Sequence, residues 1–439
     1  MTAEPGTEGL LVLRGRVVCP AGVLEDGVVV CQGDRITWVG AVSDLPPDTT
    51  VLPSAAAIPP RGTRTLLPGL VDVHCHGGAG GSFPDGDLDG ARRAAAHHRR
   101  HGTTTLLASL VSAPASHLDR LVPPLAALVE EGVLAGVHLE GPFLSPARAG
   151  AQDPAALVPG DPAALARWLE LGRGTVRSMT LAPETAHAGD LAVLLLEAGA
   201  VPSIGHTDAD AATTSAFIAA VTARGGPVSA THLFNGMPPL HHRSPGPVAA
   251  CLAGAARGEV VVELVGDGVH LDDAAVGAVL DLVGPGQVAF VTDAMAAAGM
   301  PDGRYPLGAL EVEVAGGVAR LAGGGRGGRG DRGDRGDRGD RRSIAGGTSC
   351  LVDVVRRAAG HHGVHAAVTA ASSTPAALLG MGHLVGSLLP GLRADVLVTD
   401  DDLVPMAVLA GGRWVAHPTS NTDRSTDRQT AADRAQIPE

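Results

Sequence analysis

Histidines and carboxylates that could bind a metal occur in this chain directly after short runs of Val, Leu, Ile and Ala. The first are His74 and His76, which follow the apolar run 66–73. Side chains alternate along a strand, so His74 and His76 are expected to point to the same side. Similar runs further along the chain end near Glu140, His206, His232, His270 and Asp293. Converging imidazole and carboxylate groups predict a divalent metal site.

Glu140, His206 and His232 are the expected ligands of one ion. Glu140 precedes Gly141-Pro142, and an ionised carboxylate at such a strand end is costly unless it is paired or bound to metal. A single buried histidine is more often a hydrogen-bonded core residue, but two at neighbouring strand ends favour ligation. Three protein ligands leave a position for water, whose pKa a bound ion lowers to about 7.

Asp293 is the expected general base, although a helix cap would also explain an aspartate at that position. His270 either donates a hydrogen bond to a substrate carbonyl or only holds its own loop, and the sequence leaves both roles open. The chain contains no lysine, so a carboxylated lysine cannot bridge two ions. Any bridging carboxylate must come from Glu or Asp.

The elements that position these residues alternate between apolar runs and stretches of helix-favouring composition. The apolar runs are 66–74, 104–111, 133–140, 176–182, 201–206, 227–233, 260–266 and 288–293. Stretches such as 88–101, 115–131, 188–199, 209–224 and 272–283 are predicted helices. Eight β/α units predict an α/β fold with a (β/α)8 TIM-type barrel, whose carboxyl-terminal face would hold the site.

Segments from both ends of the chain predict a second, smaller β-sandwich domain, made of residues 8–62 and 385–416. The barrel then occupies residues 63–384, with hairpin-like alternation at 305–321 and helices at 348–360 and 365–379. A Gly/Arg/Asp tract at 323–342 and a polar tail at 417–439 are predicted to be disordered.

Composition excludes several classes of partner. The chain has 33 basic and 46 acidic residues, a formal net charge of -13, which disfavours a nucleic-acid surface. Five cysteines without a C-x-x-C pair favour a reducing compartment, and we expect a cytoplasmic protein. The chain shows neither a signal-peptide pattern nor a run of the roughly 20 apolar residues that a membrane span needs.

Several segments resemble the amidohydrolase superfamily and, within it, the N-acetylglucosamine-6-phosphate deacetylase family. They include the segments that begin at Pro68, His138 (His-Leu-Glu-Gly-Pro), Gly205, Thr231 (Thr-His-Leu-Phe-Asn) and Asp267, in family order. The resemblance implies that Glu140, His206 and His232 hold the catalytic ion, and that His74 and His76 hold a second ion in members with two. Zinc, iron, manganese or cobalt would suit such ligands, with one or two ions per subunit.

The resemblance also implies the remaining roles. Asp293 would act as acid and base and His270 would orient the acetamide carbonyl. The expected substrate-binding residues are Arg148, Ala151, Gln152, Asn235, Gly236, Arg243, His270, Ile344, Ala345 and Gly346. The family often has histidine where Gln152 stands, and Gln152 cannot titrate. The resemblance further implies a homodimer, with Arg243 acting within its own subunit or across the interface.

The resemblance implies metal-dependent hydrolysis of the acetamide of N-acetylglucosamine 6-phosphate, in amino-sugar catabolism or cell-wall recycling. There are three alternative functions. The N-acetylgalactosamine 6-phosphate reaction needs only a different contact to one sugar hydroxyl. A cyclic-amide hydrolase would not need a phosphate pocket. A non-catalytic scaffold usually loses ligands or the base, whereas every ligand type and Asp293 are present here.

Overall fold

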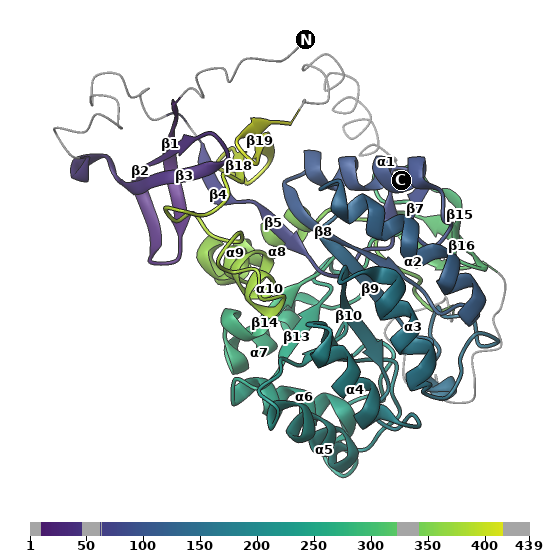
Figure 1. The fold of residues 1–439 in the computed structure, drawn as a ribbon. Helices are drawn as coiled ribbons and strands as arrows, with labels where there is room; N and C mark the ends of the chain where they lie inside the picture. The colour runs from purple at the N-terminus through teal and green to yellow at the C-terminus, as the bar shows by residue number, and fades with distance from the viewer. Residues whose placement is uncertain (1–9, 46–61, 63, 323–341, 416–439) are drawn as a thin grey trace, which may run out of the picture.

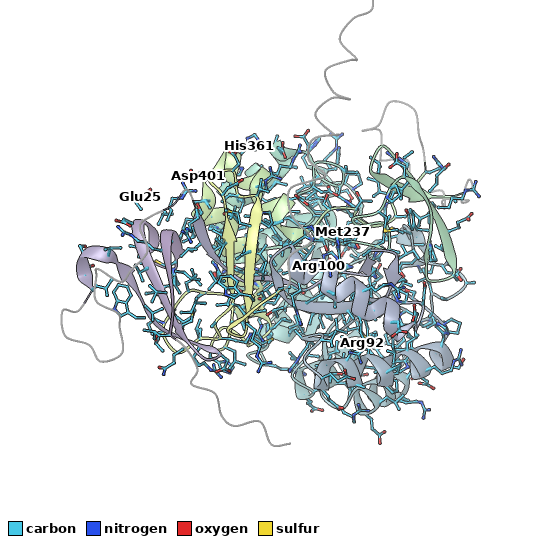
Figure 2. All side chains as sticks on the ribbon, turned by 90° about the horizontal axis from the view of Figure 1, so that it is seen from above. Glu25, Arg92, Arg100, Met237, His361 and Asp401 are labelled. Atoms are coloured by element: carbon cyan, nitrogen blue, oxygen red, sulfur yellow. The ribbon has the colours of Figure 1, made fainter. Side chains whose placement is uncertain are left out.

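The computed structural model describes residues 10–45, 62, 64–322 and 342–415. Figure 1 shows a barrel surrounded by helices and, beside it, a β-sheet built from both ends of the chain. In Figure 2, Glu25 and Asp401 mark the side of this sheet, and Arg92 marks a barrel helix. The predicted tail at 417–439 and nearly all of the 323–342 tract lie outside the described residues.

Eight parallel strands form the barrel, which confirms the predicted α/β class. In chain order they are β5 (Leu70–Asp72), β8 (Thr103–Leu110), β9 (Gly136–Glu140), β10 (Val176–Leu181), β11 (Val201–Ile204), β12 (Ser229–Ala230), β13 (Val261–Leu264) and β14 (Val288–Phe290). Their residues are almost all buried, because helices cover the outer face and side chains fill the inside. Each predicted apolar run overlaps one of these strands.

The barrel is completed where β14 meets β5. The sheet order runs from β14 to β5 without a ladder between the two. The segments that follow the strands make the junction instead, since Asp293 donates its backbone N–H to His74 O at 2.9 Å and His76 donates to Ala294 O at 2.7 Å. Asp72 adds a side-chain latch, because it accepts the Thr292 hydroxyl at 2.6 Å.

Helices form the outer ring of the barrel. They are α1 (Leu88–Arg100), α2 (Ala115–Glu130), α3 (Pro162–Gly172), α4 (Ala188–Glu197), α5 (Ala211–Thr222), α6 (Gly246–Ala256), α7 (Asp273–Val283), α8 (Leu351–His362), α9 (Val364–Ala371) and α10 (Ser373–Leu378). Asp87, Asp161, Asp210 and Asp272 cap the starts of α1, α3, α5 and α7 by accepting backbone N–H groups. Short 3-10 turns lie at Val42–Asp44, Pro146–Arg148 and Pro285–Gln287.

The second sheet has seven strands from both ends of the chain. Its order is β20 (Arg413–Trp414), β19 (Pro405–Ala410), β18 (Val396–Thr399), β4 (Thr65–Pro68), β1 (Leu10–Cys19), β2 (Gly22–Gln32) and β3 (Arg35–Ala41). Leu13 and Val29 from one end of the sheet share a core with Val396 and Leu409 from the other. The C-terminal segment therefore returns to the N-terminal one, as predicted.

The predicted run 66–74 is divided between the two sheets. β4 belongs to the second sheet and β5 to the barrel. Gly69 separates them and donates its backbone N–H to Asp395 O at 3.0 Å. A side chain at Gly69 would collide with Thr104 and Asp395, so the glycine allows the two sheets to approach each other closely.

Two small sheets lie among the loops at the barrel mouth. β6 (Gly77–Gly78) pairs with β7 (Gly81–Ser82) just after His76. β15 (Gly303–Leu307), β16 (Leu310–Ala315) and β17 (Val318–Leu321) form an antiparallel sheet, which confirms the predicted alternation at 305–321. This sheet packs on Val111, Met295 and Ala345.

In the part of the chain that the structure describes, no helix has the length and apolar character needed to span a membrane.

The latch between Asp72 and Thr292 predicts a measurable contribution to stability. Thr292→Val removes the hydroxyl donor and leaves a buried carboxylate oxygen without it, so the free energy of unfolding should fall by about 1–3 kcal/mol. Thr292→Ser keeps the hydroxyl and should lose clearly less. Urea unfolding followed by circular dichroism measures both, and equal losses would show that the hydroxyl is not the stabilising group.

Candidate active site

Six of the residues predicted from sequence meet at the carboxyl ends of the barrel strands. They are His74 and His76 after β5, Glu140 at the end of β9, His206 after β11, His232 after β12 and Asp293 after β14. All six are buried, with at most 8% of any residue exposed. Parallel strands bring their carboxyl ends to one face, so residues more than 200 positions apart in sequence become neighbours.

The carboxylate of Glu140 lies at the centre of this group. Its Oε1 is 3.0 Å from His206 Nε2 and 2.9 Å from His232 Nε2. Its Oε2 is 3.2 Å from His76 Nε2. Glu140 therefore belongs to two candidate ligand groups, one with His206 and His232 and one with His74 and His76. Burial acts to raise the pKa of Glu140, but the surrounding imidazoles outweigh it and hold the pKa well below its usual value.

Three of these residues have left-handed backbone conformations. The φ angles are 45° at His206, 28° at His232 and 47° at Asp293. Such angles are strained for residues with a side chain and concentrate at functional sites. Each residue directly follows or lies close behind a strand end, so the turn redirects its side chain toward Glu140.

The pair His74 and His76 needs a positive charge between its rings. Their Nε2 atoms lie 3.1 Å apart, and Asp293 Oδ1 is 3.4 Å from one and 3.2 Å from the other. Burial lowers the pKa of His76, but Asp293 and Glu140 outweigh it and raise the pKa to about 9. Two facing lone pairs beside two carboxylates can be satisfied by shared protons or by a cation, so the donor set fits a divalent metal.

Asp293 is held as a carboxylate at this site. Burial acts to raise its pKa, but the charges of His74 and His76 outweigh burial and lower the pKa below its usual value. A carboxylate that is ionised and buried beside the candidate ligands can accept a proton, so the geometry suits a general base.

His270 is tied to its loop and also directed at Asp293. Its Nδ1 lies 2.8 Å from Asp267 Oδ2, while its backbone N–H donates to Asp267 Oδ1 at 2.8 Å. Its Nε2 lies 3.7 Å from Asp293 Oδ2. Burial lowers the pKa of His270, but Asp267 outweighs it, so the pKa is raised and the ring can donate from Nε2. The two roles left open by the sequence are therefore compatible.

Gln152 contacts a candidate ligand directly. Its side-chain amide donates to Glu140 Oε2 at 2.7 Å, and its Oε1 accepts the backbone N–H of Ser112 at 2.7 Å. Only 4% of Gln152 is exposed. The amide thus fixes the orientation of the Glu140 carboxylate, a contact that the sequence did not predict.

Glu263 was also missed from the sequence. It lies within β13 and is 3% exposed, and its Oε2 is 3.4 Å from His74 Nδ1. A carboxylate there can fix the tautomer of a ligating imidazole, leaving Nε2 for the metal. The available signal was a single acidic residue in the otherwise apolar strand Val261–Leu264.

Several predicted substrate residues border the ligands. Gly236 stands so close to His206 that a Cβ there would lie 2.9 Å from Nδ1. Asn235 donates its side-chain amide to His232 O at 3.2 Å. The backbone carbonyl of Arg148 accepts a hydrogen bond from His206 Nδ1, 2.8 Å away. The guanidinium of Arg148 pairs with Asp208. These residues therefore lie beside His206 and His232.

The other predicted substrate residues lie further around the mouth. Ile344, Ala345 and Gly346 follow the small three-stranded sheet, and a Cβ at Gly346 would lie 3.0 Å from Asp293 O. Ala345 is buried in the apolar cluster that packs against the three-stranded sheet. Ala151 is partly buried against that cluster. Arg243 is exposed on the loop between β12 and α6, where its backbone N–H donates to His241 Nδ1 at 3.3 Å.

Comparison with known proteins agrees with this geometry. A model of the amidohydrolase family matches residues 65–280. The N-acetylglucosamine-6-phosphate deacetylase of Bacillus subtilis is 32% identical over 72% of this chain and 78% of its own. The chain belongs to the amidohydrolase family. This amidohydrolase is also 33% identical to the N-acetylgalactosamine-6-phosphate deacetylase of Escherichia coli O157:H7, over 80% of this chain and 88% of that one.

A solved structure matches this amidohydrolase along nearly its whole length. It is a mutant of the N-acetyl-D-glucosamine-6-phosphate deacetylase from Mycobacterium smegmatis, in complex with N-acetyl-D-glucosamine-6-phosphate. Identity is 38% and the TM-score 0.81, over 93% of this chain and 99% of that chain. At 14% identity and a TM-score of 0.51, guanine deaminase from Escherichia coli shares the fold alone.

The contact between Gln152 and Glu140 predicts a role in metal affinity. Gln152→Leu removes the donor to a ligand, and loss of such a partner typically weakens metal binding about 10–100-fold. Competition with a chromophoric chelator measures the dissociation constant. The same change at Gln287, on the turn Pro285–Gln287 at the opposite end of the barrel, serves as control. Equal affinities in Gln152→Leu and the unchanged protein would contradict this role.

Proposed function

We propose that this amidohydrolase removes the acetyl group of N-acetyl-D-glucosamine 6-phosphate, giving D-glucosamine 6-phosphate and acetate. The observation that carries the proposal is the buried group of Glu140, His206 and His232 with Asp293 beside it. The similarity to the Mycobacterium smegmatis deacetylase supports the same substrate, since that protein was solved with it. The reaction would belong to amino-sugar catabolism or cell-wall recycling.

Glu140, His206 and His232 would hold the catalytic ion, and His74 with His76 would hold a second where two are bound. Nitrogen and oxygen donors suit zinc, iron, manganese or cobalt. When bound, the ion would polarise the acetamide carbonyl and lower the pKa of a water. Gln152 and Glu263 would keep the ligands oriented.

Asp293 and His270 would move and place the protons. In the proposed reaction, water adds to the acetamide carbon while Asp293 accepts one of its protons. His270 donates from Nε2 to the carbonyl oxygen, held in place by Asp267. Asp293 then gives the proton to the sugar nitrogen as the carbon–nitrogen bond breaks, so acetate and the amine leave.

The sugar phosphate would be recognised by residues that follow the ligands in sequence. Asn235 and Gly236 directly follow the turn at His232, and Arg243 supplies a guanidinium that can donate two parallel hydrogen bonds to phosphate. Arg148 already pairs with Asp208, so it would need to share or exchange that partner to meet phosphate. The remaining expected contacts come from Ala151, Gln152, His270, Ile344, Ala345 and Gly346.

We also propose a homodimer, in which Arg243 serves its own or the neighbouring subunit.

The N-acetylgalactosamine 6-phosphate reaction is the second candidate. It is favoured by the similarity to the Escherichia coli O157:H7 enzyme named for that activity. Cyclic-amide hydrolysis is less favoured, because neither deacetylase relative above is named for it.

All five cysteines are free thiols, which supports a reducing cytoplasmic location.

Acetate release from N-acetylglucosamine 6-phosphate by metal-loaded protein tests the proposal. Asp293→Asn removes the proton acceptor and should lower kcat by about 10²–10⁴-fold. Asp281→Asn on the exposed face of α7 is the control and should leave kcat unchanged. Absence of acetate release by the unchanged protein, with metal bound, would contradict the deacetylase proposal. A parallel assay with N-acetylgalactosamine 6-phosphate separates the two candidates.

Arg243→Ala tests phosphate recognition. Losing a charge-assisted hydrogen bond of about 1.5–3 kcal/mol should lower kcat/KM for the phosphorylated sugar about 10–100-fold. Activity on unphosphorylated N-acetylglucosamine should change little. Arg224→Ala, at an exposed position just after α5, is the matched control. An equal loss on both sugars would indicate a structural role for Arg243 and would favour another amide substrate.

A further inference from the structure

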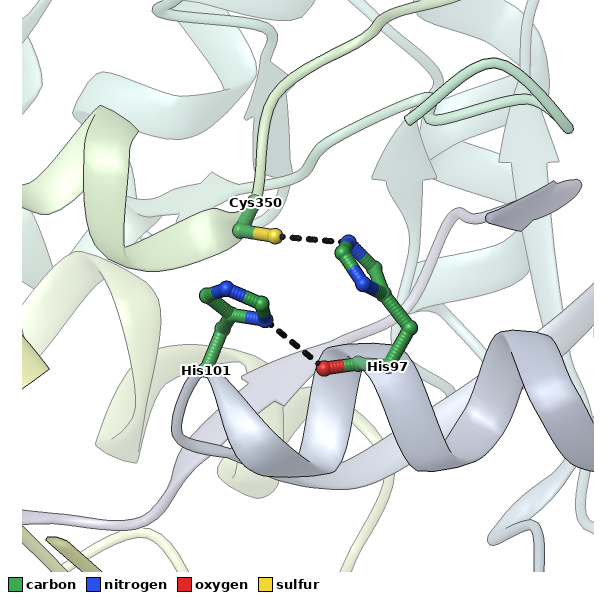
Figure 3. A group of neighbouring side chains, drawn as sticks. All are labelled: His97, His101 and Cys350. Atoms are coloured by element: carbon green, nitrogen blue, oxygen red, sulfur yellow. Dashed lines mark hydrogen bonds between the residues drawn. The ribbon is translucent and has the colours of Figure 1, made fainter. Parts of the chain in front are cut away.

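A second group of metal-binding side chains lies outside the barrel mouth, between α1 and the start of α8. His97 is in the last turn of α1, His101 follows that helix, and Cys350 is the N-cap of α8. One ligand atom of each residue lies within 4.8 Å of the others (Figure 3). This group shares no residue with the candidate active site.

The separation of the donor atoms matches that expected around a metal. Cys350 Sγ lies 3.3 Å from His97 Nε2. Zinc–sulfur and zinc–nitrogen bonds of about 2.3 and 2.0 Å, at a tetrahedral angle, place the two donors about 3.5 Å apart. Only a small adjustment of the side chains would therefore admit an ion.

The orientation of His101 leaves one ring nitrogen available. His101 Nδ1 donates to the backbone carbonyl of His97 at 2.8 Å, as Figure 3 shows. The neutral ring then has its lone pair on Nε2. Metal-binding histidines commonly have their other ring nitrogen fixed to a backbone carbonyl in this way.

The surrounding chain fixes the position of the His97 ring. A side chain at Gly299 would collide with the His97 ring, so the glycine provides the space that the ring occupies. His97 is 8% exposed and Cys350 5% exposed.

His98 lies beside this group and is buried against the segment that follows β5. It is fully buried, and its Nε2 lies 2.9 Å from Gly77 O and 3.4 Å from Cys75 Sγ. Within the described part of the chain, its Nδ1 is buried without a hydrogen-bond partner. His98 also lies beside the Cys350 thiol. A buried nitrogen left without a partner is unfavourable unless another group satisfies it.

We propose that His97, His101 and Cys350 form a second metal site, separate from the ions of the active site. It takes a divalent ion of the zinc class. Two imidazoles and a thiolate suit zinc or cobalt, whereas magnesium and calcium prefer oxygen. Binding replaces the S–H bond of Cys350 by a metal–sulfur bond and releases one proton to solvent. The fourth position is left for water.

The location gives this site a structural role. α8 contacts both β5 and β14, the two strands that no ladder joins, and α1 follows β5. An ion between His97 and Cys350 would link α1 to α8 across this junction. The site would therefore stabilise the barrel where no strand ladder joins β14 to β5.

Cobalt provides a readout that is specific to this site. The candidate active site offers only nitrogen and oxygen donors, so a near-ultraviolet sulfur-to-cobalt charge-transfer band reports a thiolate ligand alone. We would load the full chain with Co²⁺, record the absorption spectrum, and count bound Co²⁺ and Zn²⁺ per chain by mass spectrometry. Cys350→Ser should abolish the band and lower the count by one ion. Serine is itself a favoured N-cap, so α8 should still form.

Two further variants complete the test. Cys251→Ser removes another buried cysteine, on α6, and should keep both the band and the ion count. His101→Gln alters a partly exposed residue and should weaken Co²⁺ binding at this site without unfolding, as circular dichroism would verify. The proposal would be overturned if the charge-transfer band persisted in Cys350→Ser. It would also be overturned if the unchanged protein lacked the band and bound the same number of ions as Cys350→Ser.

Discussion

The site depends on one buried carboxylate, that of Glu140. It accepts contacts from imidazoles supplied by three different strand ends and from the amide of Gln152. Removing such a charge from water is unfavourable unless several donors surround it. The parallel barrel provides them, because it brings the ends of β5, β11 and β12 to the same face as β9.

Strained turns complete this arrangement. His206, His232 and Asp293 all have positive φ, which turns their side chains inward just beyond the strands. Close backbone approaches accompany them, since Gly236 lies against His206 and Gly346 against the carbonyl of Asp293. The stability of the surrounding barrel compensates for this strain, and the side chains are thereby fixed before a substrate arrives.

Alternation along one short segment connects the two candidate metal sites. His74 and His76 face Glu140, whereas Cys75 between them faces α1 and lies 3.4 Å from His98 Nε2. His98 in turn lies beside Cys350, the thiol of the proposed second site. The segment that supplies two candidate ligands is therefore packed against α1, whose last turn holds His97 and whose C-cap is His101.

The barrel, its eight strands and the placement of six candidate residues at strand ends could be predicted from the sequence, because apolar runs followed by His, Glu or Asp are local patterns. The sequence did not show that Gly69 divides the run 66–74 between two sheets, nor that Gln152 and Glu263 contact candidate ligands. Nor did it bring His97 and His101 together with Cys350. These contacts join residues far apart in the chain, and only the closed barrel sets their distances.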